Sequence, residues 1–181
     1  QACDHAMLLK RIVKGVARHH GMAATFMAKP FGDSAGSGLH IHASVYDAQG
    51  NNIFSNQNGG STPAISESLR HAIGGLAQTM VESMAIFAPN ANSYRRFKHG
   101  SYAPVSPTWG YNHREVALRV PVSSEHNRRI EQRVAGADAN PYLTMAALLA
   151  GIHHGITNQC DPGPETAAGA PLTSRKVLLP Q

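Results

Sequence analysis

Hydrophobic residues recur at the three- and four-residue spacing of an amphipathic helix in three parts of the chain. These parts are residues 7–17, where basic side chains stand between the apolar ones, and the longer stretches 62–89 and 140–155. Each longer stretch opens with a polar capping residue followed by proline, a combination favoured at helix starts. The pattern predicts three helices, the second weakened in its middle by Gly74 and Gly75.

Five short stretches have the composition or the alternation of β-strands. Residues 22–28 are largely apolar, 39–46 alternate between apolar and polar, 52–54 could return beside them, and 115–120 and 128–134 are rich in β-branched residues. Because strands and helices do not alternate regularly along the chain, we predict an α+β fold with a largely antiparallel sheet and flanking helices. No internal repeat is visible in the sequence.

The composition is typical of a globular protein, since 42% of the 181 residues are hydrophobic and 15% are charged. No apolar run has the length of a membrane span and the first residues lack a signal-peptide pattern, so we predict neither a membrane protein nor a secreted one. Cys3 and Cys160 show no disulfide or zinc spacing, which favours a cytoplasmic protein. We expect a piece of a longer protein, with one incomplete domain at residues 1–158 and an extended tail at 159–181.

The net charge of +5 is concentrated in one window, residues 95–133. This window holds eight basic residues, seven of them arginine, against three acidic residues, while the rest of the chain is neutral. Arginine binds carboxylate and phosphate through paired hydrogen bonds and keeps its charge when partly buried. Although a single arginine is more typical of a solvated surface, the group favours an anion-binding site.

A glycine-rich loop at residues 32–38 leads into His40 and His42, which share the polar face of the predicted strand. The loop matches neither a P-loop nor a Rossmann motif, but its glycines allow the backbone to approach a ligand closely. Two histidines on one face of a strand can bind a ligand or a metal. They are also common as hydrogen-bonded surface residues, and this alternative stays open.

On the predicted strand at 128–134, Arg129, Glu131 and Arg133 point the same way. A carboxylate between two guanidinium groups stays ionised and could bind a hard cation, while the arginines hold phosphate or carboxylate. The alternative is a solvated ladder of charges on an edge strand.

Four sequence blocks together resemble the catalytic domain of glutamine synthetase. They are KPFGDSAGSGLHIHAS at 29–44, APNANSYRRF at 88–97, WGYNHREVALRVP at 109–121 and RRIEQRVAGADANPYL at 128–143. The resemblance covers residues 1–158 and implies the C-terminal portion of that domain. It also implies phosphorylation of the glutamate γ-carboxylate by ATP, displacement of the phosphate by an amine, two or three Mg²⁺ or Mn²⁺ ions, and a homo-oligomeric ring.

The resemblance assigns roles to individual residues. It implies a metal site, a glutamate site and an ATP site, with two arginines that also stabilise the acyl phosphate as it forms. The implied metal ligands are His40 and Glu131; the glutamate contacts are Gly36, Arg96 and Arg133; the ATP contacts are His42, Ser44, Arg114, Arg119 and Arg129; and the catalytic arginines are Arg114 and Arg119.

The chain departs from the family pattern at three places. Tyr102 stands where glutamine synthetases carry a glutamate that helps bind ammonium, Ala35 replaces an asparagine near glutamate, and residues 124–127 lack a lysine found in some nucleotide sites. Without the carboxylate at Tyr102, we predict that the amine is organic. The chain is then most similar to γ-glutamylpolyamine synthetases and related glutamate–amine ligases, with ammonia-using glutamine synthetase as the alternative.

The family's N-terminal β-grasp domain and the first half of its catalytic domain, which bring most metal-binding glutamates, are not in these residues. Because one histidine and one glutamate cannot fill a divalent-cation site, we predict that the 181 residues alone are inactive. A basic nucleic-acid-binding module is disfavoured, since aromatic residues make up 6% and no such motif appears. A cupin-like metal protein would need partners on neighbouring strands, whereas Glu67 and His71 fall on a predicted helix.

Overall fold

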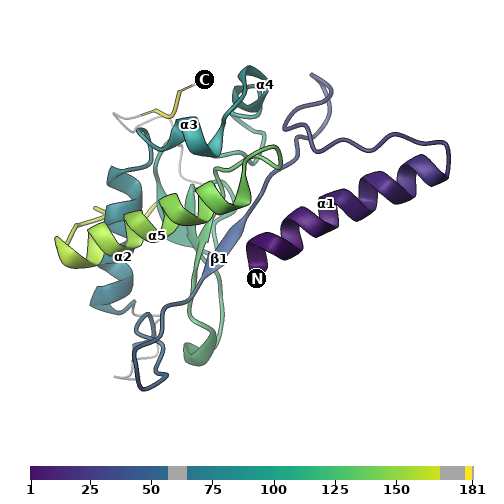
Figure 1. Cartoon of the computed structure of the whole chain (residues 1–181). Helices are drawn as coiled ribbons and strands as arrows, with labels where there is room; N and C mark the ends of the chain where they lie inside the picture. Colours follow the sequence, from purple (N-terminus) through teal and green to yellow (C-terminus); the bar gives the residue numbers. More distant parts are fainter. Residues whose placement is uncertain (57–64, 168–177, 181) are drawn as a thin grey trace.

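The computed structural model describes residues 1–56, 65–167 and 178–180 (Figure 1). Among them, the α-helices are α1 (Ala2–His19), α2 (Glu67–Gln78), α3 (Met84–Phe87), α4 (Ala91–Tyr94) and α5 (Pro141–Thr157). The strands are β1 (Ile41–Ala43), β2 (Trp109–Tyr111), β3 (Leu118–Val120) and β4 (Ile130–Gln132), with a 3₁₀ helix, η1 (Glu125–Asn127), before β4.

The strands form a sheet in the order β1-β4-β3-β2. Strand β4 pairs antiparallel with both β1 and β3, whereas β2 pairs parallel with β3. Two of the three pairings are antiparallel, so the predicted α+β fold is confirmed. Strand β2 was not predicted. Trp109–Tyr111 is short and has a central glycine, so it shows no alternation of apolar and polar residues.

The core lies between one face of the sheet and the helices α2 and α5, which cross that face (Figure 1). Ile41, Leu118 and Ile130 point into it from three strands, and Ile73 and Leu148 close it from the two helices. Because side chains alternate along a strand, the residues between these apolar ones point to the opposite face. The polar side chains of the sheet therefore gather on the face away from α2 and α5.

Helices α2 and α5 pack at glycines. A Cβ atom on Gly75 would lie 2.3 Å from the Gly151 carbonyl oxygen and 2.4 Å from Gly155 Cα, and one on Gly74 would lie 2.3 Å from the Cys160 carbonyl oxygen. Real Cβ atoms essentially never approach other atoms this closely. Gly75 thus lets α2 and α5 touch, and Gly74 lets α2 lie against the segment that follows α5.

The prediction of one long helix at 62–89 is wrong, because the described residues of this stretch form two separate helices, α2 and α3. Thr62 and Pro63 lie outside the described part, and α2 begins after Ser66, whose hydroxyl accepts the Leu69 N–H. The segment then breaks between α2 and α3, where the hydroxyls of Thr79 and Ser83 donate to carbonyls one turn earlier. Such side-chain bonds to the backbone bend helices. The predicted apolar stripe is nonetheless buried.

Two predicted strands are absent from the described residues. Residues 22–28 pair with no described strand, and the Phe26 ring lies near the ammonium groups of Lys10 and Lys14 on α1. Residues 52–54 contribute only the bridge between Tyr46 and Asn52. The remaining three predicted strands are confirmed but shorter, as β1, β3 and β4.

The first and last predicted helices are confirmed. Helix α1 starts earlier than expected, at Ala2, and Figure 1 shows it extending away from the sheet. Helix α5 has the predicted Asn140 cap, whose side chain accepts the N–H of Tyr142 and Leu143, and it continues two residues past Gly155. Within the described residues, no helix is both long and apolar enough to cross a membrane.

The described beginning of the expected tail, residues 159–167, has no helix or strand and runs beside β2. The Thr166 N–H donates to the Trp109 carbonyl at 2.9 Å, and the Trp109 indole donates to the Gly163 carbonyl at 3.1 Å. This segment therefore borders the edge strand β2.

Candidate functional site

A row of three side chains crosses the polar face of the sheet. In the strand register, His42 of β1 lies opposite Glu131 of β4, which in turn lies opposite Arg119 of β3. Directly opposed residues point to the same face, so the row places an imidazole and a guanidinium on either side of one carboxylate. Arg129 and Arg133, two positions away from Glu131 along β4, fall on the same side.

Glu131 is the centre of the cluster. It is 2% exposed, and its two oxygens accept hydrogen bonds from Arg119 at 2.8 Å and from Arg133 at 2.7 Å. The His40 Nδ1 atom lies 3.1 Å from the carboxylate and the His42 Nε2 atom 3.9 Å. Burial raises the pKa of the Glu131 carboxyl, but hydrogen bonds from His40, Arg119 and Arg133 outweigh burial and hold that pKa well below its usual value. The carboxylate is therefore ionised at neutral pH.

The arginines are held in place by further bonds. Arg119 donates to the Asn112 side-chain oxygen at 2.5 Å, and Arg133 donates to the Arg114 carbonyl at 2.7 Å. Arg129 donates to His42 Nδ1 at 3.2 Å. The guanidinium groups are thus oriented before any ligand arrives, which reduces the reorganisation that binding requires.

The ring of His42 is surrounded by cations. Burial lowers the pKa of this imidazole, Arg129, His40 and Arg119 lower it further, and Glu131 opposes them. A lowered pKa keeps the ring neutral at physiological pH, with a lone pair available to a hydrogen-bond donor or a cation.

A cavity of about 580 Å³ opens beside this row. Its wall includes the glycine-rich loop at 32–38, the buried cations Arg96 and Arg133, and His40. A Cβ atom on Gly36 would lie 2.9 Å from the Ala28 carbonyl oxygen and 3.0 Å from Arg96 Cγ. Glycine is therefore required there for the loop to lie against the Arg96 side chain.

The cavity is strongly basic. Three of its described lining residues are cationic, namely Lys29, Arg96 and Arg133, against one acidic residue, Asp33. Arg96 is anchored by a 2.9 Å hydrogen bond to the Val134 carbonyl. A concave site with excess buried positive charge is suited to an anionic ligand such as a carboxylate.

The structure brings most predicted site residues together. Six meet in the row and its flanks, and Gly36 and Arg96 meet in the adjoining cavity. Arg114 is exposed in the loop between β2 and β3, and the Ser44 hydroxyl donates to the Arg128 carbonyl at 2.9 Å. The six are His40, His42, Arg119, Arg129, Glu131 and Arg133.

Other charged residues of the basic window lie elsewhere. Arg128 is buried and paired with Glu125, so it fixes η1 against β4 rather than facing the cluster. Glu67 and His71 lie together on α2, their side chains 3.8 Å apart, and take no part in the site. Sequence reasoning missed Asn112 and Lys29. Both lie inside the family-like blocks but carry no pattern of their own.

The donor set fits a divalent cation in part. The imidazole of His40 and the carboxylate of Glu131 are suitable ligands, but a hard cation takes about six. No group of three or more histidine, cysteine, aspartate or glutamate side chains is placed for a metal among the described residues. These residues can therefore supply two ligands of such a site and not a complete one.

Comparison with known proteins identifies the family. Residues 1–173 match the family described as glutamine synthetase, catalytic domain. This chain belongs to the glutamine synthetase family. The match extends past residue 158, where the sequence resemblance stops, and takes in the described segment that borders β2.

Several characterised members of the glutamine synthetase family are similar to this chain. The gamma-glutamylputrescine synthetase PuuA of Escherichia coli K12 is 52% identical over 180 residues, 99% of this chain and 37% of the relative. A glutamate–isopropylamine ligase of a Pseudomonas species is 38% identical over 181 residues, 99% of this chain and 39% of that enzyme. The glutamine synthetase of Pyrococcus abyssi is 40% identical over 162 residues, 90% of this chain and 36% of that enzyme.

These relatives confirm the predicted likeness to glutamate–amine ligases within the family. The chain spans less than two fifths of the length of each of these relatives.

Proposed function

We propose that this chain forms the glutamate- and phosphate-binding part of a ligase that joins the γ-carboxylate of glutamate to an organic amine. ATP would phosphorylate that carboxylate, and the amine would then displace the phosphate from the γ-glutamyl phosphate. The observation that carries the proposal is the row His42, Glu131 and Arg119 beside a basic cavity. Family membership supports the same reaction class.

The row is suited to phosphoryl transfer. The transferred group carries its charge on three equatorial oxygens, so catalysis depends on cations in fixed positions rather than on covalent chemistry from the protein. Arg119 and Arg129 are such cations, and Arg114 is an exposed cation in the loop between β2 and β3. His42 and Ser44 would contact the nucleotide from the β1 side. Arg114 and Arg119 would stabilise the acyl phosphate as it forms.

His40 and Glu131 would hold one Mg²⁺ or Mn²⁺ ion together with ligands from outside these residues. A divalent ion bound there supplies positive charge to the transferring phosphate. Because Arg119 and Arg133 already fix both oxygens of Glu131, the carboxylate keeps its orientation whether or not a cation is near. Two ligands bind such an ion weakly, so we propose that the 181 residues alone have no ligase activity.

The cavity would bind glutamate. Arg96 and Arg133 would pair with its carboxylates, and the Gly36 backbone would form the wall against which the substrate lies. Arg133 lines the cavity and also bonds Glu131, so it links the glutamate site to the row. This link would place the γ-carboxylate next to the phosphate that it attacks.

Tyr102 is the basis for proposing an organic amine. It lines the cavity, is 68% exposed and has a φ of 57°, a left-handed conformation that is uncommon outside glycine. An aromatic ring at this mouth offers an apolar and cation-binding surface but no carboxylate for ammonium. Relatives named for putrescine and isopropylamine point the same way.

The test uses the whole protein that contains this chain, incubated with ATP, glutamate and a panel of diamines, monoamines and ammonia. We expect a γ-glutamyl amide of an organic amine and stoichiometric ADP. Glutamine formed from ammonia faster than any organic amide would contradict the proposed amine class. The absence of any γ-glutamyl product would contradict the proposed reaction.

A matched pair of variants tests the row itself. Arg119→Gln removes a preorganised cation and is expected to lower kcat by about 100-fold or more. Arg95→Gln removes an exposed cation from the same basic window and is expected to leave kcat within about twofold, as for other surface changes. An equal loss of kcat in the two variants would show that the reaction depends on the overall charge of the window and not on the position of Arg119.

A further inference from the structure

Lys29 is a buried cation that the proposed mechanism does not use. It is 9% exposed and lines the cavity. Its backbone N–H donates to the Asn92 side-chain oxygen at 2.8 Å, and the Asn92 amide donates back to the Lys29 carbonyl at 2.8 Å. This two-way bond to α4 fixes the base of the side chain.

The Lys29 ammonium reaches the glycine-rich loop. Its Nζ atom donates a hydrogen bond to the Ser34 carbonyl oxygen. Further along the loop, the Ser37 N–H donates to the Ala28 carbonyl at 2.8 Å, and Ser37 accepts the Ala137 N–H at 3.0 Å. Hydrogen bonds thus hold the loop in place on both sides of Gly36. The bond before Gly36 is made by the Lys29 side chain.

The charge of Lys29 is not neutralised by its neighbours. Within the described part of the chain, no carboxylate forms an ion pair with it, and its hydrogen-bond acceptor is a neutral carbonyl. An ammonium group has three donors, and a buried charge is costly unless it is paired. The cavity that it lines also contains Arg96 and Arg133. A negatively charged ligand in the cavity would offset the charge of all three.

We infer that Lys29 is a positioning residue of the glutamate site. Its ammonium holds the Ser34 carbonyl and so keeps Gly36 against Arg96, and its charge adds to the attraction for the substrate carboxylate. The inference rests on the proposed function, because it names glutamate as the ligand of this cavity. It predicts an effect on glutamate binding that is separate from ATP binding, since the row around Glu131 does not include Lys29.

The kinetic test compares three variants of the whole protein. Lys29→Met keeps the length of the side chain but removes the charge and the donors, and we expect about a tenfold or larger rise in KM for glutamate with KM for ATP nearly unchanged. Lys29→Arg keeps charge and donors and should recover part of that loss. Lys14→Met, at an exposed position on α1, is the control and should match the wild type. Equal rises in both KM values, or none, would overturn the inference.

A second test needs no variant. Lysines of the wild-type protein are acetylated at limiting reagent and quantified by mass spectrometry, with Lys14 as internal reference. We expect glutamate, but not ATP, to slow acetylation of Lys29 by about threefold or more relative to Lys14, as a bound carboxylate shields the amine. Unchanged labelling of Lys29 under saturating glutamate would overturn the inference.

The two proposals fail in different ways. If the wild type forms a γ-glutamyl amide while Lys29→Met and the labelling show no glutamate effect, the ligase proposal stands and the role of Lys29 is wrong. If no γ-glutamyl product forms but glutamate still protects Lys29, the cavity binds glutamate and the proposed reaction is wrong.

Discussion

Helices α1 and α2 have the same kind of amphipathic pattern but very different surroundings. In α2, six of the twelve residues are buried, including Leu69 and Ile73. In α1, all eighteen residues are described and none is buried, although Leu8 and Ile12 occupy an equally regular apolar stripe. Ile73 is 0% exposed and Ile12 is 51% exposed. Periodicity alone does not distinguish these two cases.

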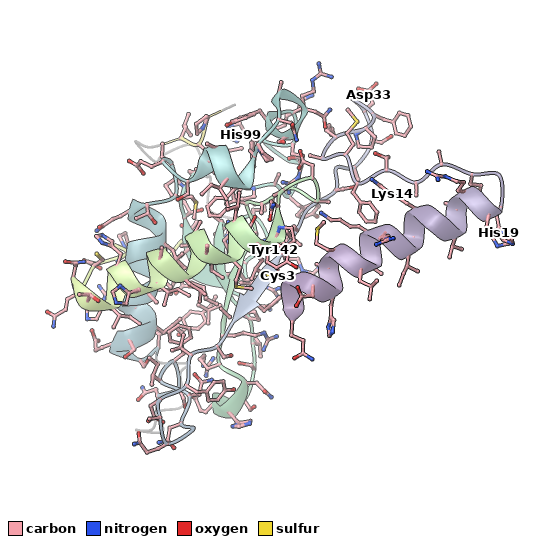
Figure 2. All side chains as sticks on the ribbon, in the orientation of Figure 1. Cys3, Lys14, His19, Asp33, His99 and Tyr142 are labelled. Carbon is pink, nitrogen blue, oxygen red and sulfur yellow. The ribbon has the colours of Figure 1, made fainter. Side chains whose placement is uncertain are left out.

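The difference lies in what packs on each helix. The apolar stripe of α2 meets α5 across the glycine contact, whereas α1 is attached through polar groups in its first half. Cys3 donates to the Pro141 carbonyl at 3.5 Å and Lys10 to the Ala137 carbonyl at 2.6 Å. Figure 2 shows Cys3 beside Tyr142 at one end of α1 and His19 far from the sheet at the other. An amphipathic pattern therefore predicts that a helix has a packing face, but not what covers it.

The sharpest test of this comparison is a pair of identical substitutions. Ile73→Ala removes fully buried methyl groups and is expected to destabilise the chain by about 2–5 kcal/mol, because it leaves a cavity in the core. Ile12→Ala removes half-exposed groups and is expected to change stability by less than about 0.5 kcal/mol. Urea unfolding followed by circular dichroism measures both, at a protein concentration too low for self-association. A loss at Ile12 as large as that at Ile73 would show that the stripe of α1 is packed in solution.

A second pair uses glycines inside the two helices. Gly75→Ala places a Cβ atom against Gly151 and Gly155, so α2 and α5 must separate, at an expected cost of about 3 kcal/mol. Gly15→Ala in α1 meets no atom within 4 Å and should stabilise that helix by up to about 1 kcal/mol through its propensity. Thermal unfolding compares them. A stable Gly75→Ala variant would mean that the helix crossing is looser than described.

Local features of the fold could be read from the sequence because their causes are local. The Asn140 cap and the proline after it define the start of α5 without any distant contact. The alternation along 128–134 places Arg129, Glu131 and Arg133 on one face whatever the rest of the sheet does. The ordered blocks then gave the family, which the comparisons confirm.

Features that depend on distant segments could not be predicted in this way. The strand register that sets Arg119 beside Glu131 joins residues on separate strands. The close approach of α2 to α5 gives Gly75 a packing role, which its low helix propensity does not reveal. Lys29 is a further case, because the role that we propose for it rests on its burial and on its bond to the Ser34 carbonyl, neither of which has a sequence signal. Arg128 is the opposite case. It belongs to the basic window that the sequence singled out, but it is buried and paired with Glu125.

The remaining prediction concerns the uncovered stripe of α1. Its exposed large hydrophobic residues form a continuous apolar face, and faces of this kind favour association between molecules. They are Leu8, Leu9, Ile12, Val13 and Val16. We expect the isolated 181-residue chain to self-associate at micromolar concentration through this face. Sedimentation velocity over a concentration series measures the association.

A matched pair of variants distinguishes the contribution of the apolar residues of α1 to association from that of its basic residues. Ile12→Gln lies in the stripe and is expected to weaken association by about tenfold, equivalent to ~1.4 kcal/mol, because it replaces an apolar contact with a polar group. Arg11→Gln lies beside the stripe and should change association by less than about twofold, since it removes no apolar contact. If Arg11→Gln weakens association as much as Ile12→Gln, the contact is electrostatic. The apolar stripes of α1 and α2 would then share a sequence pattern, but only the stripe of α2 would bury apolar side chains.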